Sequence, residues 1–385
     1  MLLTPAELTR DTRARRAAAA ATELGFGVVG VCGRISGETP VPLDDVVIVR
    51  AGRAGRTHRQ WTLGTEPKRE SGAKRELRGF FRLARYAVRT ARLVRAARTF
   101  GGTNIVHAHD LDALAAGYVL ARQARARLVY DAHELYSDFE PFPPRAARAV
   151  LLRLERTVAR RADAVVTVSD AIADELRRRF GVDPIVVLNA PPLDAREPPE
   201  PPADPLRVVY QGAFGPGRPL EDLLAGIAET RNVRLTLRVS RTPASDLRAA
   251  IPEAMRERVV PADPVPPARV IDGLHGHHAG LLFDRPLTRN AELSSPNKLF
   301  EYLMAGLAVV APRLPGLAWV EEQRLGLCFA PGSPDAMGAA LERLAADRSL
   351  LAELRANARR AAVERFNAEA QRQALARAWG VRTSS

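Results

Sequence analysis

Polar residues follow two of the short apolar runs in this sequence, and their types could take part in acid–base chemistry. Residues 107–110 read His-Ala-His-Asp, and residues 131–134 read Asp-Ala-His-Glu. Imidazole and carboxylate groups can transfer protons or hold the polar groups of a substrate. A histidine at the end of a strand is also often a satisfied structural group, so both interpretations stay open at this point.

Segment 294–311, SSPNKLFEYLMAGLAVVA, is the most informative stretch. Its first residues predict the start of a helix, whose free N–H groups and dipole favour an anion such as a diphosphate. The candidate diphosphate-binding residues are Ser295, Asn297 and Lys298, and the carboxylate of Glu301 could accept hydrogen bonds from a ribose diol. An ordinary capped helix would show the same spacing, so this segment alone leaves the two interpretations open.

Short Val-rich runs alternate with amphipathic stretches of helical length, a pattern typical of parallel strands with helical crossovers. The expected strands are 27–32, 46–50, 104–108, 127–131, 164–168, 184–188, 206–211, 234–239, 279–283 and 308–311. The expected helices of the second half are 219–230, 244–258, 297–305, 334–346 and 348–380. We therefore expect an α/β fold of two doubly wound, Rossmann-like domains, whose strand-end loops face a central cleft.

The composition of the 385 residues is that of a globular protein, with 46% hydrophobic and 26% charged residues. Cys32 and Cys328 are the only cysteines, which excludes a disulfide framework or a four-cysteine zinc site. The sequence contains no run long and apolar enough for a membrane span or an export signal, so we expect a cytoplasmic protein.

The net charge of +13 is concentrated in the N-terminal half, above all between Lys68 and Phe100. Within this run the spacing of arginines and apolar residues predicts an amphipathic helix over 75–99. Such a helix could lie peripherally on an anionic membrane, here the inner membrane face, or it could be a solvated crossover helix packed on the sheet. Its arginine face lacks interleaved aromatic residues, which argues against nucleic acid as a partner.

Five segments resemble those of one protein family in their order and spacing. They read NIVHAHDLDALAAG, LVYDAHELY, ADAVVTVSDAIADEL, VVYQGAFGPGRPLEDLL and PNKLFEYLMAGLAVVA. Together they make the chain similar to the family 4 glycosyltransferases, from about Asp11 to Trp379. The resemblance implies the GT-B fold and the transfer of a sugar, with retention of anomeric configuration, from a nucleotide-diphosphate sugar to an acceptor.

The resemblance assigns Glu301 to the second glutamate of the family's E-x7-E motif, which holds the nucleotide ribose. The first glutamate, which usually contacts the donor sugar, falls at Leu293. Its role is therefore vacant, or it passes to Glu292 or to the loop backbone.

The segment GAFGPGRP, which begins at Gly212, resembles a family segment that commonly has Arg and Lys on the donor diphosphate. Ala213 stands at the Arg position and Arg218 at the Lys position. The resemblance therefore implies that Gly212 and Arg218 contact the donor, and that Arg218 and Lys298 must supply the charge that stabilises the leaving diphosphate.

His109 matches the histidine that in the family faces the donor sugar, and the resemblance makes it the expected catalytic residue. His133 and Glu134 would line the acceptor side. We expect no metal and no cofactor, since the nucleotide-diphosphate sugar is a co-substrate. The D-x-D motif of residues 110–112 is better interpreted as the start of a helix than as a metal site.

The chain divides into an N-terminal Rossmann-like acceptor domain (1–190), a Pro-rich linker (191–205) and a C-terminal Rossmann-like nucleotide-sugar domain (206–365). The resemblance implies that residues 366–385 form a helix that crosses back to the N-terminal domain. Only residues 1–3 could belong to the first strand, so either translation starts upstream or the strand is abbreviated.

These observations predict a transferase of the hexosyltransferase type that acts in carbohydrate or natural-product biosynthesis. Its acceptor would be a glycan, a lipid-linked sugar or a secondary metabolite. The alternative is a catalytically impaired GT-B binding or partner subunit, which Leu293, Ala213 and the short amino terminus suggest. A sugar-nucleotide epimerase would need further acid or base carboxylates, which the sequence does not show.

Overall fold

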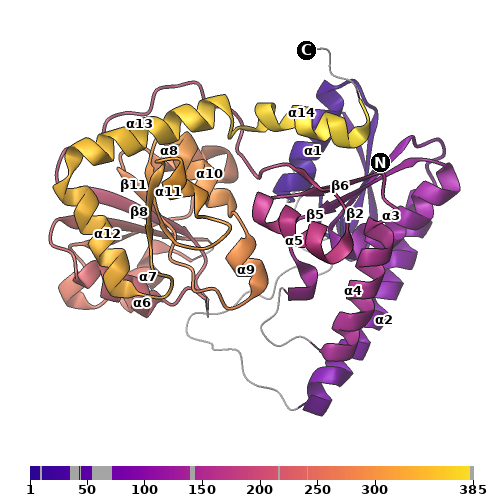
Figure 1. Ribbon diagram of the computed structural model, residues 1–385, viewed down its shortest axis with the longest axis horizontal. Helices are drawn as coiled ribbons and strands as arrows, with labels where there is room; N and C mark the ends of the chain where they lie inside the picture. The colour runs from indigo at the N-terminus through magenta and orange to yellow at the C-terminus, as the bar shows by residue number, and fades with distance from the viewer. Residues whose placement is uncertain are drawn as a thin grey trace.

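Two parallel β-sheets packed with helices form the two halves of the molecule (Figure 1). The structure, a computed structural model, describes residues 1–8, 11–34, 43, 45–53, 72–138, 144–215, 217–240 and 242–381. Residues 68–71, at the start of the expected basic run, lie outside the described residues. Residues 191–205 join the two halves and contain neither helix nor strand.

The N-terminal sheet has seven parallel strands in the order β3-β2-β1-β4-β5-β6-β7. The strands are β1 (Leu2–Leu3), β2 (Val28–Arg34), β3 (Val46–Arg53), β4 (Ile105–His109), β5 (Arg127–Ala132), β6 (Ala164–Thr167) and β7 (Ile185–Val186). The helices are α1 (Thr12–Glu23), α2 (Gly72–Ala97), α3 (Asp110–Ala124), α4 (Arg145–Ala159) and α5 (Asp170–Phe180), with a short 3-10 helix, η1 (Tyr136–Asp138). The strand order reverses between β1 and β4, and doubly wound sheets bind ligands at this switch point.

The C-terminal sheet has six parallel strands in the order β10-β9-β8-β11-β12-β13, which repeats the same winding. The strands are β8 (Leu206–Gly212), β9 (Val233–Val239), β10 (Val259–Ala262), β11 (Ala279–Leu281), β12 (Ala308–Pro312) and β13 (Gly326–Phe329). The helices are α6 (Leu220–Ala228), α7 (Ala244–Ala250), α8 (Val270–Leu274), α9 (Arg289–Leu293), α10 (Asn297–Met304), α11 (Trp319–Glu322), α12 (Pro334–Ala346), α13 (Arg348–Glu364) and α14 (Ala368–Trp379), with 3-10 helices η2 (Glu253–Met255) and η3 (Pro267–Arg269). The switch point of this sheet lies between β8 and β11.

The expected fold class is confirmed, including the abbreviated first strand. β1 has two residues, yet it lies inside the sheet and pairs with both β2 and β4. Leu3 is fully buried in the core of this half. A strand this short suffices because the neighbouring strands hold it on both sides.

Several elements of the second half differ from the expectation. The helix expected over 244–258 ends at Ala250, because Pro252 cannot continue it, and the chain then forms the unpredicted edge strand β10. The other edge strand, β13, was also missed. There the backbone of β12 comes so close that a Cβ on Gly326 would lie 1.8 Å from the carbonyl oxygen of Val309.

The helix expected over 348–380 is two helices, α13 and α14, which meet at Asn367. The Asn367 side chain accepts a hydrogen bond from the N–H of Ala370 at 2.7 Å and so caps the second helix. From this break α14 leaves the C-terminal half and lies across the N-terminal half, beside α1 (Figure 1). Its residues Leu375 and Trp379 share an apolar core with residues of the N-terminal sheet.

The basic run forms most of α2, which lies against α3 and α4 in the lower right of Figure 1. The apolar side chains that this helix buries are those of Tyr86, Leu93, Val94 and Ala97. Leu77, Phe80 and Phe81 lie exposed, and Phe80 has 66% of its surface accessible. No described helix is long and apolar enough to span a membrane.

Candidate active site

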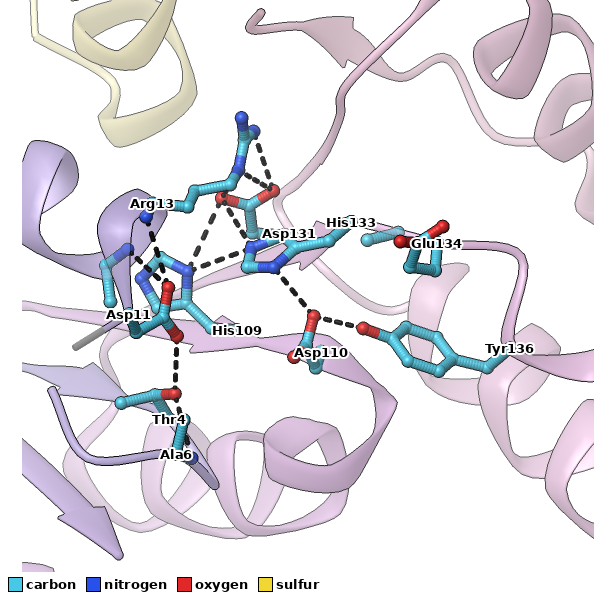
Figure 2. Close-up of polar contacts among 12 residues, drawn as sticks. Thr4, Ala6, Asp11, Arg13, His109, Asp110, Asp131, His133, Glu134 and Tyr136 are labelled. Atoms are coloured by element: carbon cyan, nitrogen blue, oxygen red, sulfur yellow. Dashed lines mark hydrogen bonds and ion pairs between the residues drawn. The ribbon is translucent and has the colours of Figure 1, made fainter. Parts of the chain in front are cut away.

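The carboxyl ends of β4 and β5 bring the two polar motifs together on adjacent strands (Figure 2). His109 ends β4 and pairs in register with Asp131 of β5. The Nδ1 atom of His109 lies 3.2 Å from Nε2 of His133, and Nδ1 of His133 lies 2.8 Å from the carboxylate of Asp110. The parallel topology explains this meeting, because the carboxyl ends of all strands lie at one edge of the sheet.

Asp110 begins α3 in a backbone conformation that residues other than glycine seldom adopt. Its φ angle is +69°, and such conformations cost on the order of 1–3 kcal/mol. The Asp110 carboxylate contacts His133 and also accepts a hydrogen bond from the hydroxyl of Tyr136. The helix that the sequence predicted at residues 110–112 therefore begins with a side chain that orients a histidine.

The carboxylate of Asp131 is the centre of this network. Arg13 of α1 binds both of its oxygens, with three contacts between 2.8 and 3.0 Å. Three imidazole nitrogens approach its Oδ2 atom: those of His107 at 3.3 Å, His133 at 3.5 Å and His109 at 3.6 Å. Burial alone would raise the pKa of this carboxyl, but Arg13 and His133 outweigh burial and hold the pKa well below its usual value.

His107 connects this carboxylate to the last helix. The indole N–H of Trp379 donates to Nδ1 of His107 at 3.1 Å, which leaves the proton of His107 on Nε2, toward Asp131. Burial lowers the pKa of His107, so this ring is neutral at pH 7. Residues of α1, β4, β5 and α14 thus meet at one carboxylate.

His109 and His133 differ in their access to solvent. The side chain of His109 is 0% exposed, whereas that of His133 is 15% exposed. Burial lowers the pKa of His109 well below its usual value; at His133 Asp110 and Asp131 outweigh burial and raise the pKa to about 10. In this conformation a substrate could reach His133 but not His109, and the catalytic role of His109 stays a prediction.

Glu134 of the N-terminal half forms hydrogen bonds with residues of the C-terminal half. Its carboxylate accepts hydrogen bonds from the Asn290 amide and from the Ser294 hydroxyl, while Asn290 Oδ1 accepts from the N–H of Leu135 at 2.7 Å. Burial raises the pKa of Glu134. Its predicted place on the acceptor side stays a prediction, and a substrate would have to compete with Asn290 for this carboxylate.

Leu293 also takes part in the contact between the halves. It is 2% exposed, packs in the core of the N-terminal half, and its carbonyl accepts from the Ser169 hydroxyl at 2.8 Å. The neighbouring Glu292 instead pairs with Arg289 on the surface. The position where the family has a sugar-contacting glutamate is here an apolar contact between the halves.

At the switch point of the C-terminal sheet, β8 ends at Gly212, whose φ angle of +148° favours glycine. A Cβ at this position would come within 3.4 Å of Nζ of Lys298. The Gln211 amide donates to the carboxylate of Glu301. Gly212, Lys298 and Glu301, which the sequence singled out in two separate segments, therefore lie together.

Lys298 is a buried cation without a hydrogen-bond partner among the described residues. Its residue exposure is 8%, its Nζ is buried, and it lies 4.6 Å from the centre of the Tyr210 ring. Burial lowers its pKa from 10.5 to about 8. An unpaired ammonium in such a place is costly, and a bound anion would relieve that cost.

The N-terminus of α10 adds to this anion site. Its N-cap residue is Pro296, which gives no side-chain hydrogen bond to the helix, so the first N–H groups can serve a ligand. Asn297 is exposed at the first helical position. Ser295 is buried and donates to the carbonyl of Gly316 at 2.8 Å, which is a structural contact.

Arg218 lies at the same end of the sheet but has a partner. Its Nε is 3.2 Å from the carboxylate of Asp284, a residue that follows β11 across the switch point. Ala213, at the position of the family's arginine, is exposed. The charge of Arg218 is therefore largely balanced before any donor binds.

Arg16 reaches this region from the N-terminal half. Its Nη1 atom is buried without a partner in the described structure, and burial lowers its pKa to about 10. Burial raises the pKa of Glu301, and the charge of Arg16 offsets part of this rise. Arg13 and Arg16 also line a cavity of about 200 Å³ between α1, residues 187–192 and α14.

His107, His109 and Asp131 are close enough together to be considered as metal ligands, within 4.8 Å of one another. The Arg13 guanidinium, however, already binds both oxygens of this carboxylate. A metal ion bound to this carboxylate would lie next to the positive charge of Arg13, which is unfavourable. These residues therefore fit an ion-pair network better than a metal centre.

The two doubly wound sheets, with their strand-end clusters, have the GT-B fold. The sequence profile of Glycosyltransferase Family 4 matches residues 13–191, slightly less than half of the 385 residues. No curated protein sequence matches the chain.

Two solved structures illustrate the likeness over the whole length. Sucrose-phosphate synthase from Thermosynechococcus elongatus is 18% identical, with 98% of this chain and 97% of that chain covered and a TM-score of 0.71. HepE of Anabaena, in complex with UDP and glucose, is 15% identical, with 98% of each chain covered and a TM-score of 0.66. At these identities the likeness shows the fold.

Sequence reasoning missed Arg13, Asn290 and Trp379 as site residues, and it gave Asp131 no role although it singled out the motif that Asp131 begins. Arg13 and Asp131 each had a signal, since Arg13 lies in the first turn of a helix that follows a central strand and Asp131 ends a strand. Asn290 and Trp379 gave no sequence signal, because Asn290 contacts Leu135, 155 positions away in the sequence, and Trp379 contacts His107, 272 positions away.

Proposed function

We propose that the protein is a retaining transferase that takes a sugar from a nucleotide-diphosphate sugar. The observation that supports this best is Lys298, which is buried and has no hydrogen-bond partner within the described ranges, beside Gly212 and the N-terminus of α10 at a switch point. A diphosphate would bind Nζ and the helix N–H groups, and Glu301 would accept hydrogen bonds from the ribose. UDP in the HepE structure supports a uridine donor as the first to be tried.

In this mechanism the protein acts mainly by stabilising the leaving group. As the bond between the sugar and the diphosphate breaks, negative charge grows on the diphosphate, next to the Lys298 ammonium and the dipole of α10. Arg218 would add to this charge if Asp284 released it. His133 would face the sugar from the N-terminal half, and the acceptor would enter from the same side.

The donor site is tested by titrating the protein with UDP-, GDP-, ADP- and dTDP-sugars, using calorimetry and slow donor hydrolysis. One nucleotide class should bind, and Glu301→Gln should weaken it by roughly 10- to 100-fold, since a hydrogen bond to a charged group contributes about 1.5–3 kcal/mol. Glu321→Gln is the matched control, because Glu321 lies near the surface, where its side chain pairs with Arg313. A folded protein that binds none of these donors would overturn the proposal.

Turnover separates the enzyme from its main alternative. Donor binding with neither hydrolysis nor transfer would support the impaired binding or partner subunit, for which the buried Leu293 is the favouring observation. The anomeric configuration of a transferred sugar, read by proton NMR, tests retention. Inversion would refute the stereochemical part of the proposal and leave the donor site intact.

We further propose that the acceptor is lipid-linked and that α2 places the protein peripherally on the inner membrane face. Leu77, Phe80 and Phe81 are exposed on this helix, and Arg85 and Arg92 are exposed on the same element. Exposed aromatics among cations suit the interface of an anionic bilayer, where each cation contributes about 1 kcal/mol.

Sedimentation with vesicles tests this contact. The protein should bind vesicles that contain phosphatidylglycerol, release them as salt rises, and ignore pure phosphatidylcholine. The double variant Phe80→Ser with Phe81→Ser should lose binding, whereas Val363→Ser, an exposed apolar site on α13, should keep it. Equal binding by both variants would exclude α2 as the contact.

A further inference from the structure

The geometry around Asp131 assigns it a role beyond holding the fold together. Its side chain is 1% exposed and carries a full charge beside Arg13, whose side chain is 8% exposed. Replacing a buried ion pair by apolar residues is often neutral or stabilising, so stability alone gives a weak reason for this arrangement. What the arrangement does achieve is orientation, because the same carboxylate faces three imidazole rings.

Each ring nitrogen of His133 lies near a carboxylate. Nδ1 lies 2.8 Å from the Asp110 carboxylate, while Nε2 lies 3.5 Å from the Asp131 carboxylate and 3.2 Å from Nδ1 of His109. A neutral imidazole has one bare nitrogen, which would then point at a carboxylate. The two carboxylates therefore favour the imidazolium form of this ring, and in that form Nε2–H would point toward Asp131 and His109.

The carboxylate of Asp131 is itself fixed by the two ends of the chain. Arg13 binds it and also donates to the Val187 carbonyl at 2.7 Å and to the Asn189 side chain at 3.1 Å, in the segment that leaves the N-terminal sheet. Trp379 of α14 orients His107 against it. The position of Asp131 thus depends on how the crossing segment and the crossing helix dock.

We propose that Asp131 is a positioning residue that keeps His133 doubly protonated and immobile at the boundary between the halves. The charged and titratable groups around His133 are Asp110 of α3, Asp131 of β5, His107 and His109 of β4, Arg13 of α1 and the neighbouring Glu134. Asp110 and Asp131 act together on the ring, one at each nitrogen. The inference rests on the proposed function only for the group that His133 would contact, which is a sugar or its leaving diphosphate. The charge of His133 does not depend on the proposed function.

NMR of histidine-labelled protein tests the charge without any substrate. The chain has seven histidines, and a His133→Gln variant assigns the signal of interest. In the wild type the His133 signal should show the protonated form throughout pH 6–9. In Asp131→Asn its midpoint should fall by roughly 1–3 pH units, the usual effect of one close opposite charge.

Asp131→Asn could also fail to fold, because it leaves the Arg13 guanidinium buried without its carboxylate. Asp110→Asn, at the other ring nitrogen, should lower the same midpoint. Asp112→Asn is the matched control, because Asp112 lies on the same helix as Asp110 and pairs with Arg89 of α2. A wild-type His133 that titrates near its ordinary value would overturn the proposal. So would a midpoint unchanged in both Asp110→Asn and Asp131→Asn.

Activity provides an independent reading. Asp131→Asn should lower kcat for transfer or donor hydrolysis while leaving the donor KM near the wild-type value, because the side-chain contacts of Asp131 are with Arg13 and the three histidines and not with the residues proposed to hold the diphosphate. If the His133 midpoint is high in the wild type and falls in Asp131→Asn, but the protein binds no donor, the proposed function is refuted and the role of Asp131 is retained. A shifted midpoint with unchanged kcat would refute the positioning role.

Discussion

Replacing Lys298 by methionine should separate the stability of this protein from its affinity for the donor. The lysine is buried, and its pKa in the fold is about 8, against 10.5 for a free side chain. The difference of about 2.5 pH units, at 1.36 kcal/mol per unit, means that holding the charge inside the fold costs about 3 kcal/mol at pH 7. The contact with the Tyr210 ring offsets part of this, about 0.5–1 kcal/mol. Lys298→Met should therefore raise the free energy of unfolding by about 2–3 kcal/mol.

The pH dependence of this gain has a definite sign. Between pH 8 and 10.5 the unfolded lysine still binds a proton that the folded lysine has lost, so the wild type gains stability relative to the variant as pH rises. The advantage of Lys298→Met should be full below pH 8 and gone near pH 10.5. Denaturant unfolding of both proteins at a series of pH values measures it.

The same substitution should weaken the binding of a nucleoside diphosphate by tenfold or more at pH 7, because the charged hydrogen bond to the phosphate is lost. Calorimetric titration with UDP, or with the nucleotide found in the donor screen, measures this. A variant that is less stable than the wild type at pH 7, or that binds the diphosphate equally well, would refute the assignment of Lys298 as a buried cation kept for the donor.

Three further substitutions test other parts of the structure. Burial raises the pKa of Glu155 from 4.5 to about 7. The folded protein therefore loses stability as pH rises from 4.5 through 7, because the buried carboxyl must give up its proton. Glu155→Gln should abolish this part of the pH dependence of thermal unfolding. Leu293→Glu should lower the melting temperature and bring no gain in donor hydrolysis, because the new carboxylate would be buried in the contact between the halves. Ala213→Arg should strengthen diphosphate binding in calorimetry, because the position is exposed and the site has few unpaired cations.

Much of the fold could be predicted because parallel strands buried on both faces appear as continuous apolar runs. β4, β5, β8 and β12 are such runs, and all were expected within one or two residues of their observed bounds. The edge strands β10 and β13 are short, with four residues each. β10 contains Pro261, tolerated only because this strand lies at the edge, and β13 begins with a glycine.

The residues of the candidate site were predictable where topology alone brings them together. Lys298 and Glu301 share one helix turn, and Gly212 ends a strand at the switch point, so their meeting follows from the winding of the sheet. The contacts of Glu134 with Asn290 depend instead on how the two halves dock. No local pattern encodes that docking, because the packing of two large surfaces decides it.

The charge balance of the site explains why the contact between the halves matters for binding. Arg218 is balanced by Asp284, and the charges around Asp131 cancel, since Arg13 and His133 stand against Asp110 and Asp131. Lys298 is the one buried ammonium without a partner in the described part of the chain. A diphosphate carries more negative charge than a single lysine can balance, so the remainder must come from the N–H groups of α10 and from Arg16 across the boundary. Donor affinity should thus depend on the approach of the N-terminal half, because that half carries Arg16.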